Sequence, residues 1–436
     1  MLEYLHLKNV GPAPELTMEL GSRLNLITGD NGLGKSFLLD VAWWALTRRW
    51  PHDVNGKLTS GYAAQPTDRG SPATIDFRLT SKRGHVGYTS HYSPRDEAWT
   101  GKAGRPWNPG LVLYAHSDGG FSVWDPARNY WKKKGNVDVQ ERLPAYVFSA
   151  QEVWDGLEID IGGKPTVVCN GVIRDWAGWV REDGPNALNL SSLLETLAPE
   201  GEVLGAGPLV RLSVNDARDI PSIRTGYSGA VPILYASSGV RRALGLAYML
   251  LWSWNEHRLA AALLGEQPTS QVVVLFDEIE SHLHPRWQRS ILSSLLTAAV
   301  WLHGEATVQL VATTHSPLVM ASAEPMFDSQ KDVWFDLDLD RAAGTVALTK
   351  RPFVRKGTAG KWLTSPAFDL TSEGRPVEAE QAIADAERIL DRHREQKPLG
   401  AAEVLVVDAA LRAVLPDVDR FWIRWSEVVD ELKEGG

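Results

Sequence analysis

The sequence predicts an α/β fold in which a mixed, largely buried central sheet is flanked by helices, and two observations predict it. The apolar stretch Leu24–Thr28 indicates a buried strand that leads through a glycine-rich loop into a helix over about residues 35–48. Two further apolar runs, Val272–Phe276 and Val308–Thr313, end in polar residues. Strands that are buried on both faces and carry polar groups at their carboxyl ends are typical of α/β sheets.

The loop after the first strand has the G-x-x-x-x-G-K-[ST] pattern of a phosphate-binding loop. Its glycines allow positive φ angles, so that backbone N–H groups face phosphate oxygens, and the N-terminus of the next helix favours an anion. Lys35 is predicted to reach the β- and γ-phosphates and to assist catalysis, and Ser36 to ligate Mg²⁺. The residues predicted to bind nucleotide here are Gly29, Asp30, Asn31, Gly32, Leu33, Gly34, Lys35, Ser36 and Phe37.

Two carboxylates follow the strand Val272–Phe276 directly. Asp277 is predicted to complete the Mg²⁺ site, and Glu278 to act as the general base that polarises the attacking water. Acidic residues also cap helices, but two of them immediately after an apolar strand favour the catalytic interpretation.

His315 lies just beyond the strand Val308–Thr313, in the sequence Thr-His-Ser-Pro. There it is predicted to contact a γ-phosphate or the attacking water and to take part in catalysis. A single histidine is more often structural, but its place 38 residues after Asp277 (315 − 277) favours a role in the site.

A small turn, Ser237-Ser238-Gly239, precedes a long apolar helix predicted over about residues 240–257. Backbone N–H groups and hydroxyls at such a helix start form a second anion-binding surface, so Ser237, Ser238 and Gly239 are predicted to contact nucleotide. An ordinary helix cap is the structural alternative.

Together these motifs resemble the ATP-binding-cassette (ABC) superfamily. Ala236–Val240 is similar to its signature motif, Leu-Ser-Gly-Gly-Gln, Ser281–His284 stands where its D-loop stands, and His315 matches its switch histidine. The pattern D-E-x-E-x-x-L-H-P from Asp277, followed by T-T-H-S-P, resembles bacterial AAA-family ATPases related to RecF, to the OLD nucleases and to the ATPase subunit of the Septu anti-phage system. Two short strands before the phosphate-binding loop and the tail after residue 350 also resemble this group.

The resemblance implies a P-loop NTPase of the ABC-ATPase head type that uses ATP and Mg²⁺. It implies that Gln151, at the end of a strand-like run, is the Q-loop glutamine that contacts nucleotide and Mg²⁺. It also implies a homodimer in which two heads meet head to tail, each signature turn acting on the other's ATP. Two departures, Ser238 for glycine and Val240 for glutamine, weaken a transporter interpretation.

Four regions are predicted along the chain. Residues 1–150 hold the phosphate-binding loop and a β-rich extension, residues 151–230 a helical and mixed insertion, and residues 231–350 the second part of the ATPase lobe, which ends in a β-hairpin. Residues 351–436 are predicted to form a helical tail, with helices over about 376–394 and 401–434.

The charge balance limits the partners. Lys and Arg number 45 against 54 Asp and Glu, so the net charge of −9 argues against a surface that coats nucleic acid. A local basic groove for DNA remains open, and Tyr130–Lys134 mixes aromatic and basic residues, although a solvated turn is the more frequent explanation. A single cysteine, the lack of a signal-like start and the lack of a long apolar run favour a cytoplasmic protein without a membrane partner.

Two other groups of side chains could bind a metal ion, but a structural role is favoured for each. Asp336, Asp338 and Asp340 alternate along one predicted strand and are interpreted as a solvated edge face rather than a metal cluster. Glu280, His282 and His284 have zinc-binding side chains, but their position favours a loop at the dimer seam.

The predicted function is that of a Mg²⁺-dependent ATPase whose dimerisation cycle controls a DNA transaction, such as repair, or an antiviral effector. The residues after the hairpin hold no acidic triad of a nuclease, so any effector, for which a nuclease is one candidate, is expected on another chain. Two alternatives stay open: a scaffold that binds ATP but hardly hydrolyses it, and, less favoured, the ATP-binding subunit of a transporter.

Overall fold

The computed structural model describes residues 1–81, 84–101, 107–129, 142–226, 229–304, 306–341 and 344–434. It divides into two compact units, Met1–Gly357 and Thr358–Gly436. The boundaries predicted at residues 150, 230 and 350 stay predictions. Tyr130–Lys134, the candidate nucleic-acid surface, lies outside the described residues. No helix in the described ranges is long and apolar enough to cross a membrane.

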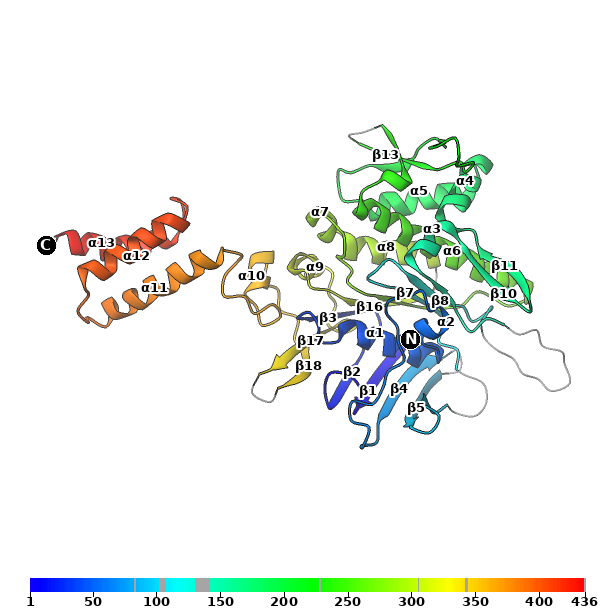
Figure 1. Cartoon of the computed structure of the whole chain (residues 1–436), viewed down its shortest axis with the longest axis horizontal. Coiled ribbons are helices and arrows are strands. Elements are labelled where there is room, and N and C mark those ends of the chain that lie inside the picture. Colours follow the sequence, from blue (N-terminus) through cyan, green and yellow to red (C-terminus); the bar gives the residue numbers. More distant parts are fainter. Residues whose placement is uncertain are drawn as a thin grey trace. The chain divides into compact units, whose positions relative to one another are not determined.

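A mixed central sheet forms the middle of the first unit (Figure 1), with the strand order β18-β17-β3-β16-β15-β7-β8-β9. The five inner strands from β17 to β7 run parallel, while β18, β8 and β9 are antiparallel to their neighbours. The predicted mixed sheet and its three central strands are confirmed. Its strands are β3 (Leu24–Gly29), β7 (Leu111–Ala115), β8 (Phe121–Trp124), β9 (Tyr146–Phe148), β15 (Gln271–Phe276), β16 (Thr307–Thr313), β17 (Val333–Asp340) and β18 (Thr345–Arg351).

One face of the central sheet packs against helix α1 (Lys35–Thr47), which also contacts a second, antiparallel sheet of order β2-β1-β4-β5-β6. Trp43 and Trp44 of α1 are buried in the apolar core that both sheets share. Burial of such large rings is a main source of stability, so this core fixes the start of α1 relative to the central sheet. The strands are β1 (Leu2–Lys8), β2 (Glu15–Glu19), β4 (Thr74–Ser81), β5 (Gly84–Ser93) and β6 (Ala98–Trp99).

Helices α5, α6 and α8 lie on the opposite side of the central sheet from α1 (Figure 1). They contact one another, and α8 contacts β16. The elements on this side are α3 (Ala150–Asp155), β10 (Leu157–Ile161), β11 (Lys164–Cys169), α4 (Gly171–Glu182), α5 (Pro185–Leu197), β12 (Leu204–Ala206), β13 (Ser222–Thr225), β14 (Ala230–Pro232), α6 (Ser238–Leu263), α7 (Pro285–Gln288), α8 (Ile291–His303) and α9 (Pro317–Ala323). Two short helices complete the unit, α2 (Pro51–Val54) and η1 (Ile233–Tyr235).

The second unit, Thr358–Gly436, is helical, and its own core includes Ile389, Leu411 and Trp425. Its helices are α10 (Ala359–Leu363), α11 (Val377–Arg394), α12 (Ala401–Val414) and α13 (Phe421–Glu434). The prediction of one continuous helical stretch over 401–434 is wrong, because the chain leaves the helix between α12 and α13. Pro416 lies in this break, and proline lacks the N–H that a helix interior requires.

Two other sequence interpretations need correction. The runs Leu111–Ala115 and Phe121–Trp124, placed in a β-rich extension, are β7 and β8 of the central sheet itself. Strand β17 is not an edge strand, since β3 and β18 flank it, and Asp336 is buried rather than solvated. Its carboxylate accepts hydrogen bonds from Thr28 (2.8 Å) and Arg351 (3.3 Å), while burial raises its pKa.

Candidate nucleotide-binding site

The phosphate loop, Gly29–Ser36, connects β3 to α1 at the carboxyl edge of the central sheet. Two of its glycines are sterically required. At Gly29 (φ +139°) an added Cβ would lie 2.3 Å from the Leu337 carbonyl oxygen of the neighbouring strand β17. At Gly34 (φ +99°), the residue before α1, it would lie 2.8 Å from Pro12 Cγ. The loop therefore keeps its backbone close to β17 and to the β1–β2 turn, and a side chain at either position would displace it.

Lys35 is the first residue of α1, and its side chain folds back over the loop. Its Nζ donates hydrogen bonds to the carbonyl oxygens of Gly29 and Asp30, both at 2.8 Å, and the residue is only 5% exposed. Burial lowers the pKa of Lys35, and the charges of Asp277 and Glu278, among others, act against this. Phosphate oxygens bind where a positive charge lies next to backbone N–H groups, and the Lys35 ammonium group beside the loop backbone is such an arrangement.

Asp277 follows β15 and is held by two neighbouring strands. Its N–H donates to Ala115 at the end of β7 (2.9 Å), and its carboxylate accepts from the Thr313 hydroxyl of β16 (2.7 Å). The same hydroxyl accepts the N–H of Glu278 at 2.7 Å. Thr313 thus orients the carboxylate of Asp277, in the way that outer-shell groups orient metal ligands, and it holds the backbone of Glu278.

The backbone of Glu278 has φ +48°, a left-handed conformation that is uncommon for a non-glycine residue. It turns the chain sharply just after the strand. Strained conformations of this kind cluster at functional sites and persist where surrounding contacts fix them, here through Thr313. Both carboxylates consequently stay at the sheet edge where β3 and β16 also end.

Glu280 connects this turn to the chain after β16. Its carboxylate accepts a hydrogen bond from the Thr314 hydroxyl (2.7 Å) and one from the backbone N–H of His315 (2.5 Å). Burial raises the pKa of Glu280. The E-x-E spacing after β15 therefore fixes the position of His315. Among the described residues, no three His, Cys, Asp or Glu side chains are grouped so that they could hold a metal ion.

His315 is half-buried beside the phosphate loop, and its ring hydrogen-bonds with the Gly29 backbone. Burial, and then the charge of Lys35, lower the pKa of His315, so the ring is neutral near pH 7. A neutral imidazole can donate or accept a proton next to a phosphate. The structure thus brings His315, Lys35 and Asp277 together at one point of the sheet edge.

These residues fit Mg²⁺ and a nucleotide triphosphate. Mg²⁺ binds through one or two carboxylates completed by hydroxyl, water and phosphate oxygens rather than through a cage of protein ligands. Asp277 and the half-buried Ser36 at the start of α1 provide that partial set. The N–H groups of the loop backbone and the positive charge of Lys35 would suit the phosphate oxygens of a nucleoside triphosphate.

The signature turn, Ser237–Gly239, lies at the start of α6. The Ser237 hydroxyl accepts the N–H of Val240 (3.4 Å), so it also caps the helix. An added Cβ at Gly239 would lie 3.1 Å from the His282 carbonyl oxygen, which places the turn against the chain after β15. Ser237 and Ser238 are exposed on the surface of the unit, as contact with a second molecule would require.

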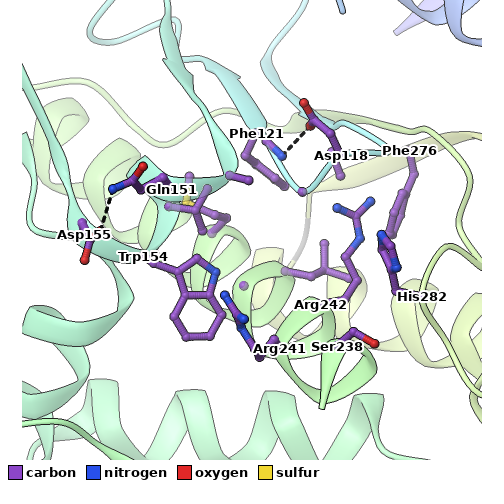
Figure 2. Close-up of a pocket in the computed structure, with 18 of the residues that line it drawn as sticks. Asp118, Phe121, Gln151, Trp154, Asp155, Ser238, Arg241, Arg242, Phe276 and His282 are labelled. Atoms are coloured by element: carbon purple, nitrogen blue, oxygen red, sulfur yellow. Dashed lines mark hydrogen bonds between the residues drawn. The ribbon is translucent and has the colours of Figure 1, made fainter. Parts of the chain in front are cut away.

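Gln151 lies on α3, and the structure does not pair it with the phosphate loop. Its amide donates to Asp155 at 3.4 Å. It lines a cavity of about 450 Å³ together with Trp154, Ser238, Arg242 and His282 (Figure 2). The cavity lies between α3 and the signature turn. The role of Gln151 in nucleotide and Mg²⁺ binding stays a prediction.

Two protein-family models match the segments that form this site. The "AAA domain" model matches residues 4–103, which include the phosphate loop. The model described as "AAA domain, putative AbiEii toxin, Type IV TA system" matches residues 211–321, which include the signature turn, Asp277 and His315.

The two segments that form this site are therefore similar to AAA domains.

Curated relatives match this chain over short segments. The chain is 29% identical over 112 residues to the Retron Vc95 probable ATPase of Vibrio cholerae serotype O1 biovar El Tor, and 48% identical over 46 residues to the Septu protein PtuA of Bacillus mycoides (strain KBAB4). These segments make up 26% and 11% of this chain, and they span only 19% and 6% of the relatives' own lengths.

The SMC head domain from Thermotoga maritima is 14% identical with a TM-score of 0.38, and the match covers 80% of this chain and 99% of that one. The recombination mediator protein RecF of the RecFOR pathway is 13% identical with a TM-score of 0.35, covering 81% and 98% of the two chains.

Several residues of this site have no role assigned by the motifs recognised in the sequence. Thr313 and Glu280 orient the predicted catalytic groups, and the pattern E-x-E followed by T-T-H was the available signal. Gly11 and Pro12 pack beneath the loop: an added Cβ at Gly11 would lie 2.4 Å from the ring of Phe37. Phe37, predicted to contact nucleotide, is thus half-buried against the β1–β2 turn, and its contact with nucleotide stays a prediction.

Proposed function

We propose that this protein binds ATP with Mg²⁺ and hydrolyses it in a head-to-tail homodimer. The observation that supports it is the convergence of Lys35, Asp277, Glu278 and His315 at the phosphate loop, from three separate segments of the chain. In this proposal the loop amides and Lys35 hold the β- and γ-phosphates. Mg²⁺, held by Ser36 and Asp277, would supply charge that neutralises the phosphate oxygens.

Glu278 is proposed to take the proton of the attacking water as general base. His315, neutral and fixed by Glu280, is proposed to hydrogen-bond the γ-phosphate or that water. Lys35 offsets the negative charge that develops on the transferred group. The exposed signature turn would act on the nucleotide of the second copy, so that ATP joins the two heads and hydrolysis releases them.

The biological role is proposed to be control of an effector in anti-phage defence, or of a DNA transaction. The support is similarity to a retron ATPase and to a Septu protein. The described residues of the second unit form a helical bundle. The effector, for which a nuclease is one candidate, is proposed to be a separate chain that responds to the ATP state of the heads.

The test compares turnover by the wild type with Glu278→Gln and Lys35→Ala. Glu278→Gln should lower turnover by about a hundredfold or more, because it lacks the general base. It should still bind ATP, and we expect it to elute as an ATP-trapped dimer in size-exclusion chromatography. Lys35→Ala should lose ATP binding. Glu158→Gln, an exposed carboxylate on β10, is the matched control and should behave as the wild type. Hydrolysis by Glu278→Gln at the wild-type rate would contradict the assigned role.

The scaffold alternative has one specific feature in its favour, the substituted signature turn with Ser238 and Val240. It predicts tight ATP binding and ATP-dependent dimers with turnover at background in the wild type itself. The same experiment therefore separates the two functions.

A further inference from the structure

Arg242 reaches from the signature helix to the end of the central sheet. It lies on α6, one turn after the signature turn, and its guanidinium donates to the His116 carbonyl oxygen at 2.7 Å. The guanidinium carbon also lies 5.5 Å from the ring centroid of Phe276, the residue directly before Asp277. Figure 2 shows the side chain extending from α6 between Asp118 and Phe276.

Two hydrogen bonds to successive carbonyl groups connect Arg242 to the backbone of Asp277. Arg242 donates to His116, and the preceding residue, Ala115, accepts the N–H of Asp277 at 2.9 Å. These two acceptors are successive peptide carbonyls at the end of β7. A shift of Arg242 would therefore be transmitted to the peptide that positions Asp277.

The charge of Arg242 acts on the same carboxylates. Burial lowers the pKa of Arg242, and the charges of Asp118, Asp277 and Glu278 oppose this, so the guanidinium lies within electrostatic range of all three. Arginine stays protonated in proteins, so this is a fixed positive charge in a poorly solvated place, where charge interactions are strong.

We infer that Arg242 is a positioning residue that couples the signature turn to Asp277 and Glu278 of the same chain. The inference rests on the proposed ATPase function and deepens it. When the nucleotide of a second copy binds to Ser237–Gly239, the first turn of α6 shifts and moves Arg242. The movement changes the position of the two carboxylates in the same chain and the electrostatic field that acts on them. Each nucleotide site of the dimer thereby responds to occupation of the other.

The cavity beside α6 makes such a shift sterically feasible. It has a volume of about 450 Å³ and is lined by side chains of α3, α6 and the β7–β8 turn, including Trp154, Phe121 and Met249 (Figure 2). Close-packed interiors resist movement, whereas a helix end next to a void can shift without displacing neighbouring side chains.

The neighbouring Arg241 offers a matched control. It lines the same cavity but is exposed, and its guanidinium carbon lies 4.9 Å from the ring centroid of Trp154 rather than near the sheet. Replacing Arg241 removes the same charge and a similar volume from the same turn of α6. It leaves in place the hydrogen bonds of Arg242 with His116 and of Asp277 with Ala115.

The first experiment measures kcat and KM for ATP hydrolysis in Arg242→Gln and Arg241→Gln. We expect kcat to fall roughly tenfold or more in Arg242→Gln with KM for ATP and ATP binding unchanged, because one close charge interaction is lost. Arg241→Gln should keep the wild-type kcat. Equal kcat in Arg242→Gln and wild type, or equal losses in both variants, would overturn the inference. Absence of turnover in the wild type would contradict the proposed function itself.

The second experiment separates positioning from a general effect on folding. Arg242→Ala enlarges the cavity, and free guanidinium ion at millimolar concentration is expected to restore part of its kcat while leaving Glu278→Gln inactive. Arg242→Lys, which keeps the charge, should lie between wild type and Arg242→Gln. Failure of guanidinium to restore Arg242→Ala, together with Arg242→Lys as slow as Arg242→Gln, would overturn the inference even if Arg242→Gln does not fold.

Discussion

At the scale of single residues, Asp40 is a buried carboxyl group with no role in the proposed chemistry. It lies on α1 and accepts a hydrogen bond from the Tyr114 hydroxyl of β7 at 2.9 Å. Burial raises the pKa of Asp40 from 3.8 to about 7, and the charge of Asp277 adds to this. The folded state therefore holds a proton on Asp40 over a pH range in which the unfolded chain has lost it.

The sign of the resulting pH dependence follows from linkage. Between pH 3.8 and about 7 the folded state binds more protons at Asp40 than the unfolded state, so stability falls as the pH rises through this window. The shift corresponds to at most about 4 kcal/mol at 1.36 kcal/mol per pKa unit. We predict that Asp40→Asn, which resembles the protonated form, loses less free energy of unfolding than the wild type between pH 5 and pH 8.

Denaturant unfolding at both pH values measures this difference. Asp53→Asn, an exposed carboxyl on α2, is the control and should follow the wild type. A decline in Asp40→Asn as steep as that of the wild type would show that Asp40 is ionised in the folded protein at neutral pH.

At the scale of elements, α3 depends on its first turn. The Ser149 hydroxyl and backbone form a capping box with Glu152, whose carboxylate also accepts hydrogen bonds from Asn55 and Lys57, both at 2.7 Å. The loop that follows α2 thus holds the helix that carries Gln151. A helix of only six residues has little stability of its own, so its cap and tertiary contacts determine whether it forms.

We predict that Ser149→Ala lowers the free energy of unfolding by about 1 kcal/mol, the usual effect of removing an N-cap hydroxyl. Urea unfolding followed by circular dichroism measures it. Ser426→Ala, an exposed serine within α13, should change stability by less than about 0.5 kcal/mol. A loss at Ser149 no larger than that at Ser426 would mean that Asn55 and Lys57 alone fix the helix.

The elements that the sequence predicted correctly are those whose pattern is local. Strands β3, β15 and β16 are continuous apolar runs buried on both faces, and the phosphate loop is defined by closely spaced residue types. The same locality explains why α1 and α6 were predicted to start near Lys35 and Val240. Such elements need no knowledge of their neighbours.

What the sequence could not provide depends on pairing between distant segments. Nothing local shows that Leu111–Ala115 pairs with β15, or that Asp336 lies between β3 and β18 with Thr28 as its partner. Thr313 and Glu280 contact the other site residues because β15 and β16 are neighbouring strands. Arg242 is 35 residues from Asp277 in the chain (277 − 242), and only the fold brings them into electrostatic range.

At the scale of the whole molecule, the proposed nucleotide site is complete only in a pair. Lys35, Asp277 and His315 lie together within one chain, while the signature turn is exposed at the start of α6. A closed two-fold dimer would make two equal composite sites, each built from the phosphate loop of one copy and the signature turn of the other. This arrangement predicts complementation between inactive variants.

In Lys35→Ala both composite sites lack the phosphate lysine, and in Ser237→Arg both lack a functional signature turn, so each variant alone should be inactive. In a mixed dimer, one site carries both changes and the other carries neither. With equal amounts, half of the dimers are mixed and each has one intact site, so turnover of at most about a quarter of the wild-type value is expected. The inferred coupling lowers this value further, because the other site of the mixed dimer is not occupied. Steady-state ATP hydrolysis after mixing measures this.

The control mixture pairs Lys35→Ala with Glu278→Gln. Both changes affect the half-site that holds the phosphates and the general base, so neither composite site of that mixed dimer is intact and no turnover should return. Recovery in the first mixture but not in the second assigns the signature turn to the partner's nucleotide. Turnover in the first mixture equal to the sum of its two components would show instead that each chain completes its own site, and the head-to-tail dimer would have to be abandoned.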